Sequence, residues 1–152
     1  GYDVHRLVPE RKLILGGVHI PYDKGLLGHS DADVLIHAVI DALLGALALG
    51  DIGRHFPDTD PQYKDMDSRI LLHKTYIFIN EIGYRINNLD VTVCAKEPKL
   101  SEYIDLMRHN LANSLFTDFL NISIKATTEE GMGVSGSGDA ISATCVVTLI
   151  KK

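Results

Sequence analysis

Hydrophobic and polar positions recur along this chain with two periods, and the longer period predicts helices. From about 31 to 49, apolar residues follow the spacing of one buried helical face. Ser30 or Asp31 is the expected N-cap of this helix and Gly50 its stop, because side-chain oxygens accept free N–H groups at helix starts and glycine commonly follows helix ends. The pattern predicts three helices in all, at about 31–49, 68–82 and 99–117.

The shorter period, strict alternation of apolar and polar residues, predicts strands. The opening "GYDVH" reads as a strand, and "KLILGGVHI" (12–20) reads as a small hairpin around Gly16 and Gly17. These elements together predict one α+β domain over residues 1–152, with a mixed β-sheet covered by helices. Longer strands are expected at 84–96, 121–126 and 140–150. Loops are expected at 51–67 and at the glycine-rich 127–139.

Composition and charge narrow the class of protein. No apolar run is long enough to span a membrane, so no membrane partner is expected. The formal net charge is −5 and Lys and Arg do not cluster, which argues against nucleic-acid binding. An acidic protein that handles phosphates must supply positive potential locally, for example from bound cations. Cys94 and Cys145 lack CxxC spacing and are expected to be reduced, as in a bacterial cytoplasm, or in an organelle stroma if a targeting segment has been removed.

Polar residues near the start of the first apolar helix suggest a metal site. A strand would place Asp3 and His5 on one face, and His29, Asp33 and His37 are spaced so that a helix would align them in one stripe. Asp3, His5 and one of His29 or His37 could form a three-ligand site with an open fourth position, the pattern of catalytic zinc. The alternative for His37 is a core histidine with satisfied hydrogen bonds. The other histidines are expected at the surface or in loops: His19, His55, His73 and His109.

A second group of chemistry-bearing residues follows the strand at 121–126. Thr127, Thr128, Glu129 and Glu130 precede several glycines, so hydroxyls, carboxylates and flexible backbone meet at the end of a strand, where ligands commonly bind. The alternative is a mobile loop without a ligand. The segment contains neither a Walker lysine nor a GxGxxG motif before a helix, so no known phosphate-binding motif supports the ligand site.

Three segments resemble one known family: "GYDVHR", "GGVHIPYDKGLLGHSDADVLIHAVIDALLGALALGDIGRHFPDTDP" and "KATTEEGMG". They resemble the 2-C-methyl-D-erythritol 2,4-cyclodiphosphate synthases of the non-mevalonate isoprenoid pathway, and the likeness runs along essentially the whole chain. It implies a homotrimer with active sites between neighbouring subunits, and loose association with the other enzymes of the pathway. It also implies a phosphorus–oxygen lyase, which cyclises 4-diphosphocytidyl-2-C-methyl-D-erythritol 2-phosphate to the 2,4-cyclodiphosphate and releases CMP.

The resemblance also implies roles for individual residues. Asp3, His5 and His37 match zinc ligands, and Glu130 matches the carboxylate that holds magnesium or manganese. His29 and Thr128 match the catalytic residues. The residues that match the substrate-binding site are Asp3, Val4, His5, His29, Ser30, Asp51, Ile52, Gly53, Phe56, Pro57, Asp58, Thr59, Asp60, Ala95, Lys96, Glu97, Pro98, Lys99, Leu100, Ser101, Thr127, Thr128, Glu129, Glu130, Val134 and Ser137.

The chemistry of this reaction fits those residue types. The substrate's 2-phosphate attacks its own β-phosphorus in line while CMP leaves, so no protein nucleophile is needed. Positioning and charge neutralisation by two divalent metals would carry the catalysis. Two alternatives stay open. One is a zinc hydrolase or lyase that uses a metal-bound water with His29 or Asp33 as base, and the other is a metal-stabilised trimeric binding protein without turnover.

One part of the sequence departs from the family pattern. Several members carry a Gly-Arg-Gly-Glu run near the threefold axis, where an isoprenoid diphosphate can bind. Here "GSGDA" places Ser137 at the arginine and Asp139 at the glutamate, and Val134 replaces a frequent phenylalanine. Serine offers one neutral hydroxyl where arginine offers a planar cation with five donors. Our hypothesis is that the axial cavity binds isoprenoid diphosphates weakly or not at all, and the alternative is neutral drift.

Overall fold

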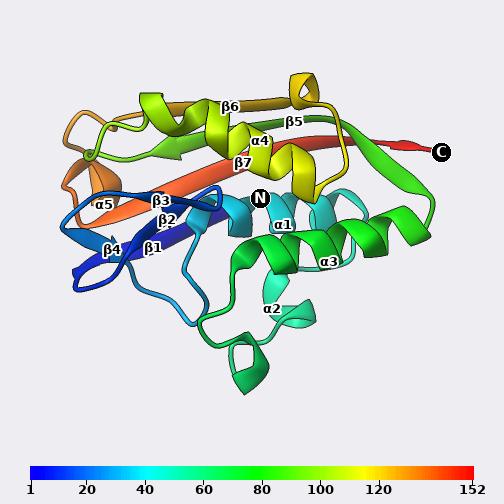
Figure 1. Cartoon of the computed structure of the whole chain (residues 1–152), viewed down its shortest axis with the longest axis horizontal. Helices are drawn as coiled ribbons and strands as arrows, with labels where there is room; N and C mark the ends of the chain where they lie inside the picture. The colour runs from blue at the N-terminus through cyan, green and yellow to red at the C-terminus, as the bar shows by residue number, and fades with distance from the viewer.

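A mixed five-stranded sheet forms the centre of the computed structural model, which describes all of residues 1–152 (Figure 1). Its strand order is β4-β1-β7-β5-β6. The β5 and β6 strands pair in parallel and the other neighbours pair antiparallel, as expected for a mixed sheet. The strands are β1 (Tyr2–Pro9), β4 (Lys24–Leu26), β5 (Tyr84–Cys94), β6 (Ile122–Thr127) and β7 (Ala140–Lys151).

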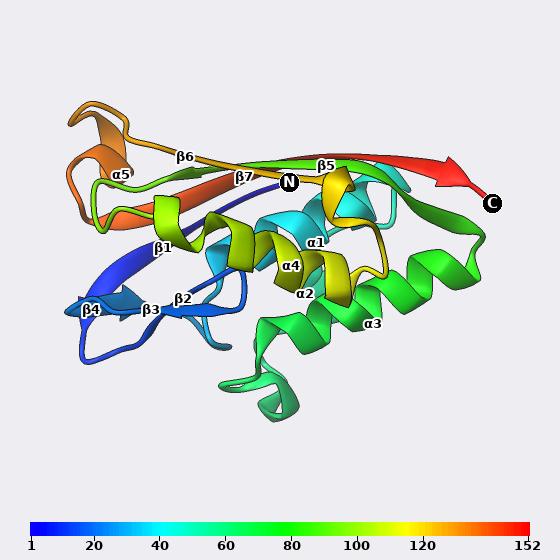
Figure 2. The ribbon, with the colours of Figure 1, turned by 45° about the horizontal axis from the view of Figure 1, so that its top comes forward.

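Three longer helices cover one face of this sheet: α1 (Val34–Ala46), α3 (Ser68–Glu81) and α4 (Ile104–Ser114). Helix α1 packs on β1 and β7, α4 packs on β6, and α3 packs on both helices. Figure 2 shows the helices on one side of the sheet and no element on the other. The uncovered face includes apolar side chains, because Tyr2, Val4 and Val146 are exposed.

The core lies between the sheet and α1. This helix lacks the polar face of a surface helix. Nine of its thirteen residues are buried. Each fully buried Leu or Ile contributes roughly 1.5–3 kcal/mol to folding relative to an exposed side chain. Cys94 and Cys145 are free thiols, as predicted, and none of the helices is long and apolar enough to cross a membrane. The apolar run from Val34 onward is therefore the centre of a packed core.

The first helix starts later than the sequence indicated. It begins at Val34, with Asp33 as N-cap accepting the N–H of Ile36, so the prediction of Ser30 or Asp31 as N-cap is wrong. The cause is local: Ala32 has φ +59°, a left-handed conformation that a helix cannot contain. The same effect ends the helix at Ala46, before the predicted stop, because Ala48 has φ +56°.

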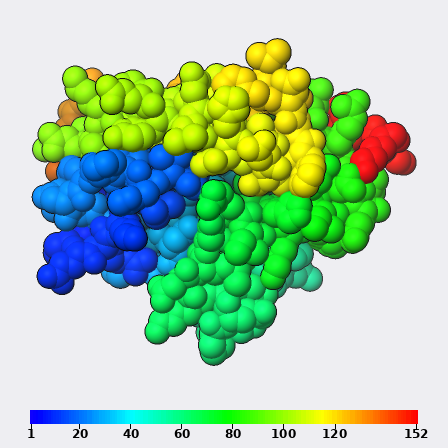
Figure 3. Space-filling model, in the orientation of Figure 1, coloured from blue at the N-terminus to red at the C-terminus, as the bar shows by residue number.

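Other boundaries also differ from the periodic pattern. The segment 51–67 is not only loop: it contains α2 (Ile52–His55) and the 3₁₀ turn η1 (Pro61–Tyr63), capped by the side chains of Asp51 and Asp60. In Figure 3 this segment protrudes at the lower edge of the molecule. The expected helix 99–117 begins instead with the 3₁₀ turn η2 (Ser101–Tyr103) before α4. The glycine-rich 127–139 contains the short helix α5 (Gly133–Gly136), and the 3₁₀ turn η3 (Phe119–Asn121) precedes β6.

The predicted hairpin is confirmed. Strands β2 (Leu13–Leu15) and β3 (Val18–Ile20) pair antiparallel and are joined by Gly16 and Gly17. Both glycines have positive φ, +56° and +71°, which the tight two-residue turn requires. The β4 strand that follows was not predicted, because three residues carry too little periodicity.

Candidate active site

Three side chains from two distant segments converge beside the sheet. The β1 strand presents Asp3 and His5 on one face, as the alternation predicted, and the first turns of α1 present His37 toward them. Asp3 Oδ2 lies 2.9 Å from His5 Nε2 and 3.1 Å from His37 Nδ1. The two ring nitrogens are 3.2 Å apart. These three atoms form a nearly equilateral triangle, and we call the residues the Asp3–His5–His37 cluster.

The cluster fits a divalent metal of the zinc type. Two imidazoles and one carboxylate are a common catalytic donor set, and an ion bound at about 2.0–2.1 Å by tetrahedral ligands separates them by about 3.3 Å. The observed edges of 2.9, 3.1 and 3.2 Å are close to that spacing. His5 also holds its other nitrogen, Nδ1, 2.8 Å from the carbonyl of Leu27, which leaves Nε2 for the cluster. No other group of three such side chains converges in the structure.

The electrostatics of the metal-free cluster favour a charged pair. Burial alone would raise the pKa of Asp3, but hydrogen bonds and charges from His37 and His5 outweigh burial and hold that pKa below its usual value. Burial lowers the pKa of His5, but the hydrogen bond and the charge of Asp3 outweigh it and raise that pKa. Asp3 is therefore a carboxylate at neutral pH, the form that binds a metal.

The predicted stripe of His29, Asp33 and His37 does not exist. Because α1 starts at Val34, His29 lies in the preceding bend, where its Nε2 is 3.2 Å from the carbonyl of Asp60. The carboxylate of Asp33 is fully buried and points away from the cluster, accepting the N–H groups of Gly16 and Gly17 in the hairpin turn. Asp33 cannot act as a solvent-facing base, and of the two candidate histidines it is His37 that joins Asp3 and His5.

A pocket of about 410 Å³ opens over the cluster, and we call it the Asp3 pocket. Eight of the predicted substrate-site residues line this pocket, and so does His37. Within its lining, the ring of Phe56 packs edge-on against the ring of Tyr63. The eight are Asp3, His5, His29, Ser30, Ile52, Gly53, Phe56 and Asp58. Five others from the same segments do not: Val4, Asp51, Pro57, Thr59 and Asp60. Val4 is on the opposite face of β1, and the carboxylates of Asp51 and Asp60 cap α2 and η1.

Sequence reasoning missed four residues that line the Asp3 pocket: Leu27, Gly28, Tyr63 and Leu71. Gly28 has a clear structural reason, because a Cβ there would be 3.1 Å from His5 Cε1 and 2.8 Å from the Cβ of Ala32. The glycine therefore makes room for the ring of His5. No periodicity marks these residues, since the pocket forms only when separate segments of the chain meet.

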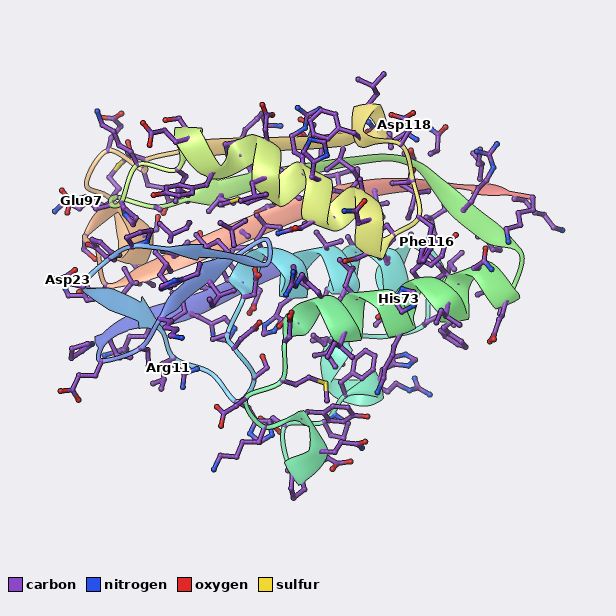
Figure 4. The ribbon with its side chains drawn as sticks, viewed as in Figure 1. Arg11, Asp23, His73, Glu97, Phe116 and Asp118 are labelled. Atoms are coloured by element: carbon purple, nitrogen blue, oxygen red, sulfur yellow. The ribbon has the colours of Figure 1, made fainter.

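A second pocket, also of about 410 Å³, lies at the β5–β6 edge of the sheet, and we call it the Thr128 pocket. The predicted residues that line it are Ala95, Lys96, Pro98, Lys99, Leu100, Ser101, Thr127 and Thr128, and Ile104 and Ala126 were missed. Glu97 does not line it, and Figure 4 shows that side chain at the outer tip of the loop after β5. The Asp3 and Thr128 pockets share no residue.

The four remaining candidates in the glycine-rich segment line neither pocket. Glu130 is exposed, with Thr128 donating its hydroxyl to it over 3.3 Å. Glu129 instead accepts the hydroxyl of Ser135, and Ser137 donates to the carbonyl of Val134 and to Asp139. The structure thus separates Glu130, which is free to bind an ion, from Glu129, which is used within the loop.

The other histidines take structural positions. His19 is exposed on β3, and His55 lies 3.0 Å from the carbonyl of Leu49. His73 packs against Phe116 with ring centroids 5.3 Å apart, as Figure 4 shows across α3 and the end of α4. His109 stacks on Phe119. None reaches the cluster. His19 and His109 are exposed, as expected, whereas His55 and His73 are half-buried on helices.

Comparison with known proteins gives the family. A model described as the YgbB family matches residues 1–150. The chain belongs to the YgbB family. Proteins named 2-C-methyl-D-erythritol 2,4-cyclodiphosphate synthase are similar along their length, which confirms the resemblance seen in the sequence. That of Finegoldia magna is 59% identical over 100% of this chain and 96% of its own, and that of Clostridioides difficile is 58% identical over 99% and 93%.

Solved structures share the fold. The "Bifunctional IspDF from Campylobacter jejuni" superposes with a TM-score of 0.96 at 41% identity, covering 100% of this chain and 41% of that one. The "IspF (Plasmodium falciparum) CDP complex" gives a TM-score of 0.87 at 36% identity, covering 100% and 94%. The α+β fold with a mixed sheet is therefore that of the family.

Proposed function

We propose that this chain cyclises 4-diphosphocytidyl-2-C-methyl-D-erythritol 2-phosphate to 2-C-methyl-D-erythritol 2,4-cyclodiphosphate and releases CMP, in isoprenoid precursor synthesis. The observation that carries the proposal is the Asp3–His5–His37 cluster at the floor of a pocket that also holds His29 and Ser30. Full-length relatives named for this synthase activity support it. The assignment as a phosphorus–oxygen lyase follows from the reaction.

The residues of the Asp3 pocket would hold the reacting phosphates. Asp3, His5 and His37 would bind zinc, which would supply a Lewis acid for a phosphate oxygen. His29 has Nε2 directed to the carbonyl of Asp60, so its Nδ1 would donate to a phosphate oxygen only when the ring carries two protons. Ile52 and Gly53 at the start of α2 would hold substrate hydroxyls, and Phe56 and Asp58 would close over the methylerythritol part.

The residues of the Thr128 pocket would hold the nucleotide end of the substrate. The backbone of 95–101 and Thr127 would enclose the cytosine, and Lys96 and Lys99 bring positive charge to an otherwise acidic protein. Thr128 would donate to a phosphate oxygen in the transition state. Glu130, exposed beside Thr128, would hold magnesium or manganese, since hard cations prefer oxygen ligands.

A complete site would require two subunits. Within one chain the Asp3 and Thr128 pockets share no residue. A substrate that contacts both kinds of pocket would therefore bind between two neighbouring subunits, with one pocket from each. The uncovered sheet face supports such an assembly, because Tyr2, Val4 and Val146 expose apolar surface there (Figure 2). We propose a homotrimer that packs these faces around its axis.

A zinc hydrolase acting through a metal-bound water is the second candidate. Asp33 cannot be its base, since it is buried and caps α1, which leaves His29. Phosphorus NMR of the product separates the candidates. We expect a cyclic diphosphate and stoichiometric CMP, whereas linear phosphates would favour hydrolysis. Zinc binding without any turnover would favour a binding protein.

A further inference from the structure

The ring of His37 is held from the side opposite the cluster. Its Nδ1 faces Asp3, while its Nε2 lies 3.1 Å from Ser68 Oγ and 3.1 Å from Ser30 Oγ. Ser68 is the first residue of α3, 31 residues further along the chain, and is fully buried. A buried hydroxyl at this position is not needed to cap α3, because Asp67 is the N-cap.

Ser68 is itself fixed by Asp31. The carboxylate of Asp31 accepts the hydroxyl of Ser68 through Oδ1 and its backbone N–H through Oδ2, the latter at 2.9 Å. Asp31 is held in turn, since its N–H donates to the carbonyl of Met66 over 3.1 Å. The N–H of Asp65 similarly donates to the carbonyl of His29 over 2.9 Å. The chain on either side of α3's start is thus tied to the segment 29–31.

The direction of these hydrogen bonds determines which nitrogen of His37 carries the proton. A serine hydroxyl has one hydrogen, and Ser68 gives it to a carboxylate, which can only accept. Toward His37, Ser68 Oγ therefore offers lone pairs alone, so Nε2 must donate. In a neutral imidazole with Nε2–H, Nδ1 is the unprotonated nitrogen. That is the atom directed at Asp3 Oδ2 and His5 Nε2.

We propose that Ser68 and Asp31 are positioning residues that fix His37 in the tautomer and orientation needed to ligate a metal through Nδ1. The proposal rests on the metal-binding part of the proposed function. It assigns a use to a serine and an aspartate that are not in the cluster, because outer partners of metal-binding histidines commonly orient the rings. In this arrangement Ser30 Oγ also accepts from the Nε2–H of His37. The hydroxyl hydrogen of Ser30, which lines the Asp3 pocket, therefore stays free to donate to a ligand.

The first test is the tautomer of His37 in the metal-free protein. We expect nitrogen NMR of the labelled full chain to show a proton on Nε2 of His37 that exchanges slowly with solvent, because Ser68 can only accept from this nitrogen. An Nε2 without a proton would overturn the proposal. This readout needs neither zinc nor substrate, so it decides the proposal even if the chain proves to have no synthase activity.

The second test is zinc affinity, measured by competition with a chromogenic chelator. Ser68→Ala removes the acceptor and should weaken zinc binding about 10–100-fold. Asp31→Asn, which can turn its amide toward Ser68 and release the serine hydrogen, should weaken binding in the same direction and is the second variant if Ser68→Ala does not fold. Thr75→Val is the matched control, because it removes a buried hydroxyl of the same helix that bonds only to the carbonyl of Leu71.

Three outcomes are distinguishable. Loss of affinity in Ser68→Ala and Asp31→Asn, with Thr75→Val near the wild type, supports the proposal. Equal affinities in all four proteins overturn it. If the wild type binds no zinc, the metal-binding part of the proposed function fails, and the NMR assignment of Nε2 alone decides whether Ser68 orients the ring.

Discussion

Asp3 Oδ2 and His37 Nδ1 lie 3.1 Å apart, although 34 residues separate them in the chain. A strand and a helix meet at this contact, and each contributes a side chain that would be costly to bury without a partner. Asp3 remains ionised because both histidines offset the effect of burial on its pKa. The contact is the structural basis for the metal site on which the first prediction depends.

His37→Ala should abolish stoichiometric zinc binding and synthase activity while leaving the fold intact. Removing one of three ligands leaves Asp3 and His5, too few for a stable catalytic site. Metal analysis after dialysis measures the effect, and His19→Ala, an exposed histidine on β3, is the control. One zinc per chain in His37→Ala would show that His29 or another residue completes the site.

The uncovered sheet face should be the surface through which subunits associate. If the proposed trimer forms, Val146→Arg, near the centre of β7, should give a smaller mass by light scattering than the wild type, because it would place a charge in a buried contact. Ile77→Arg changes another exposed apolar residue, on α3 on the helical side, and should leave the mass unchanged. A monomeric wild-type protein would exclude the trimer altogether.

Shared active sites can be tested by mixing two inactive proteins. Asp3→Ala disables the Asp3 pocket and Thr128→Ala the Thr128 pocket. If each site takes one pocket from each of two neighbours, random trimers of the two variants should recover about a quarter of wild-type activity. Each variant alone should show little. No recovery after verified subunit exchange would mean that both pockets of one site belong to one chain.

Asp33 should make the stability of the fold depend on pH. Burial raises its pKa from the usual 3.8 to about 6, against the opposing effect of its three backbone hydrogen bonds. Because the folded state binds the proton more tightly than the unfolded state, the contribution of Asp33 to stability should be greatest below about pH 4 and be lost as pH rises through about 6, a change of roughly 3 kcal/mol.

Denaturant unfolding at several pH values measures this effect. Asp33→Asn cannot ionise, so the difference in stability between wild type and variant should change across the window from pH 4 to 6. Asp118→Asn, an exposed cap of η3, should show no such change. Parallel curves for wild type and Asp33→Asn would show that Asp33 is ionised throughout.

The glycine-rich segment should bind isoprenoid diphosphates weakly or not at all. Ser137 is neutral, and its hydroxyl already donates to Val134 and Asp139 within the segment. Ser137→Arg should create binding, because arginine adds a planar cation near the proposed threefold axis. Calorimetric titration with geranyl or farnesyl diphosphate measures it. Tight binding of one ligand per trimer by the wild type would disprove the expectation.

The sequence by itself determined the elements and part of the cluster. Periodicity is a local property, so the hairpin, the two long strands and the apolar helix could be predicted from short windows, and alternation alone placed Asp3 and His5 on one face. The resemblance to the synthase family predicted the main segments that line both pockets. The proton arrangement that joins His37 to Ser68 could not be predicted, because it depends on atoms 31 residues apart.

The tertiary structure decided which polar residues work together. His29 and His37 are equivalent by spacing, but the left-handed Ala32 and the cap at Asp33 end the helical register between them, so only His37 reaches Asp3. The sequence allowed Asp33 as a base, but in the fold its carboxylate is buried and accepts the N–H groups of Gly16 and Gly17 in the hairpin turn. Such choices come from packing between distant segments, which fixes side-chain directions that no local pattern encodes.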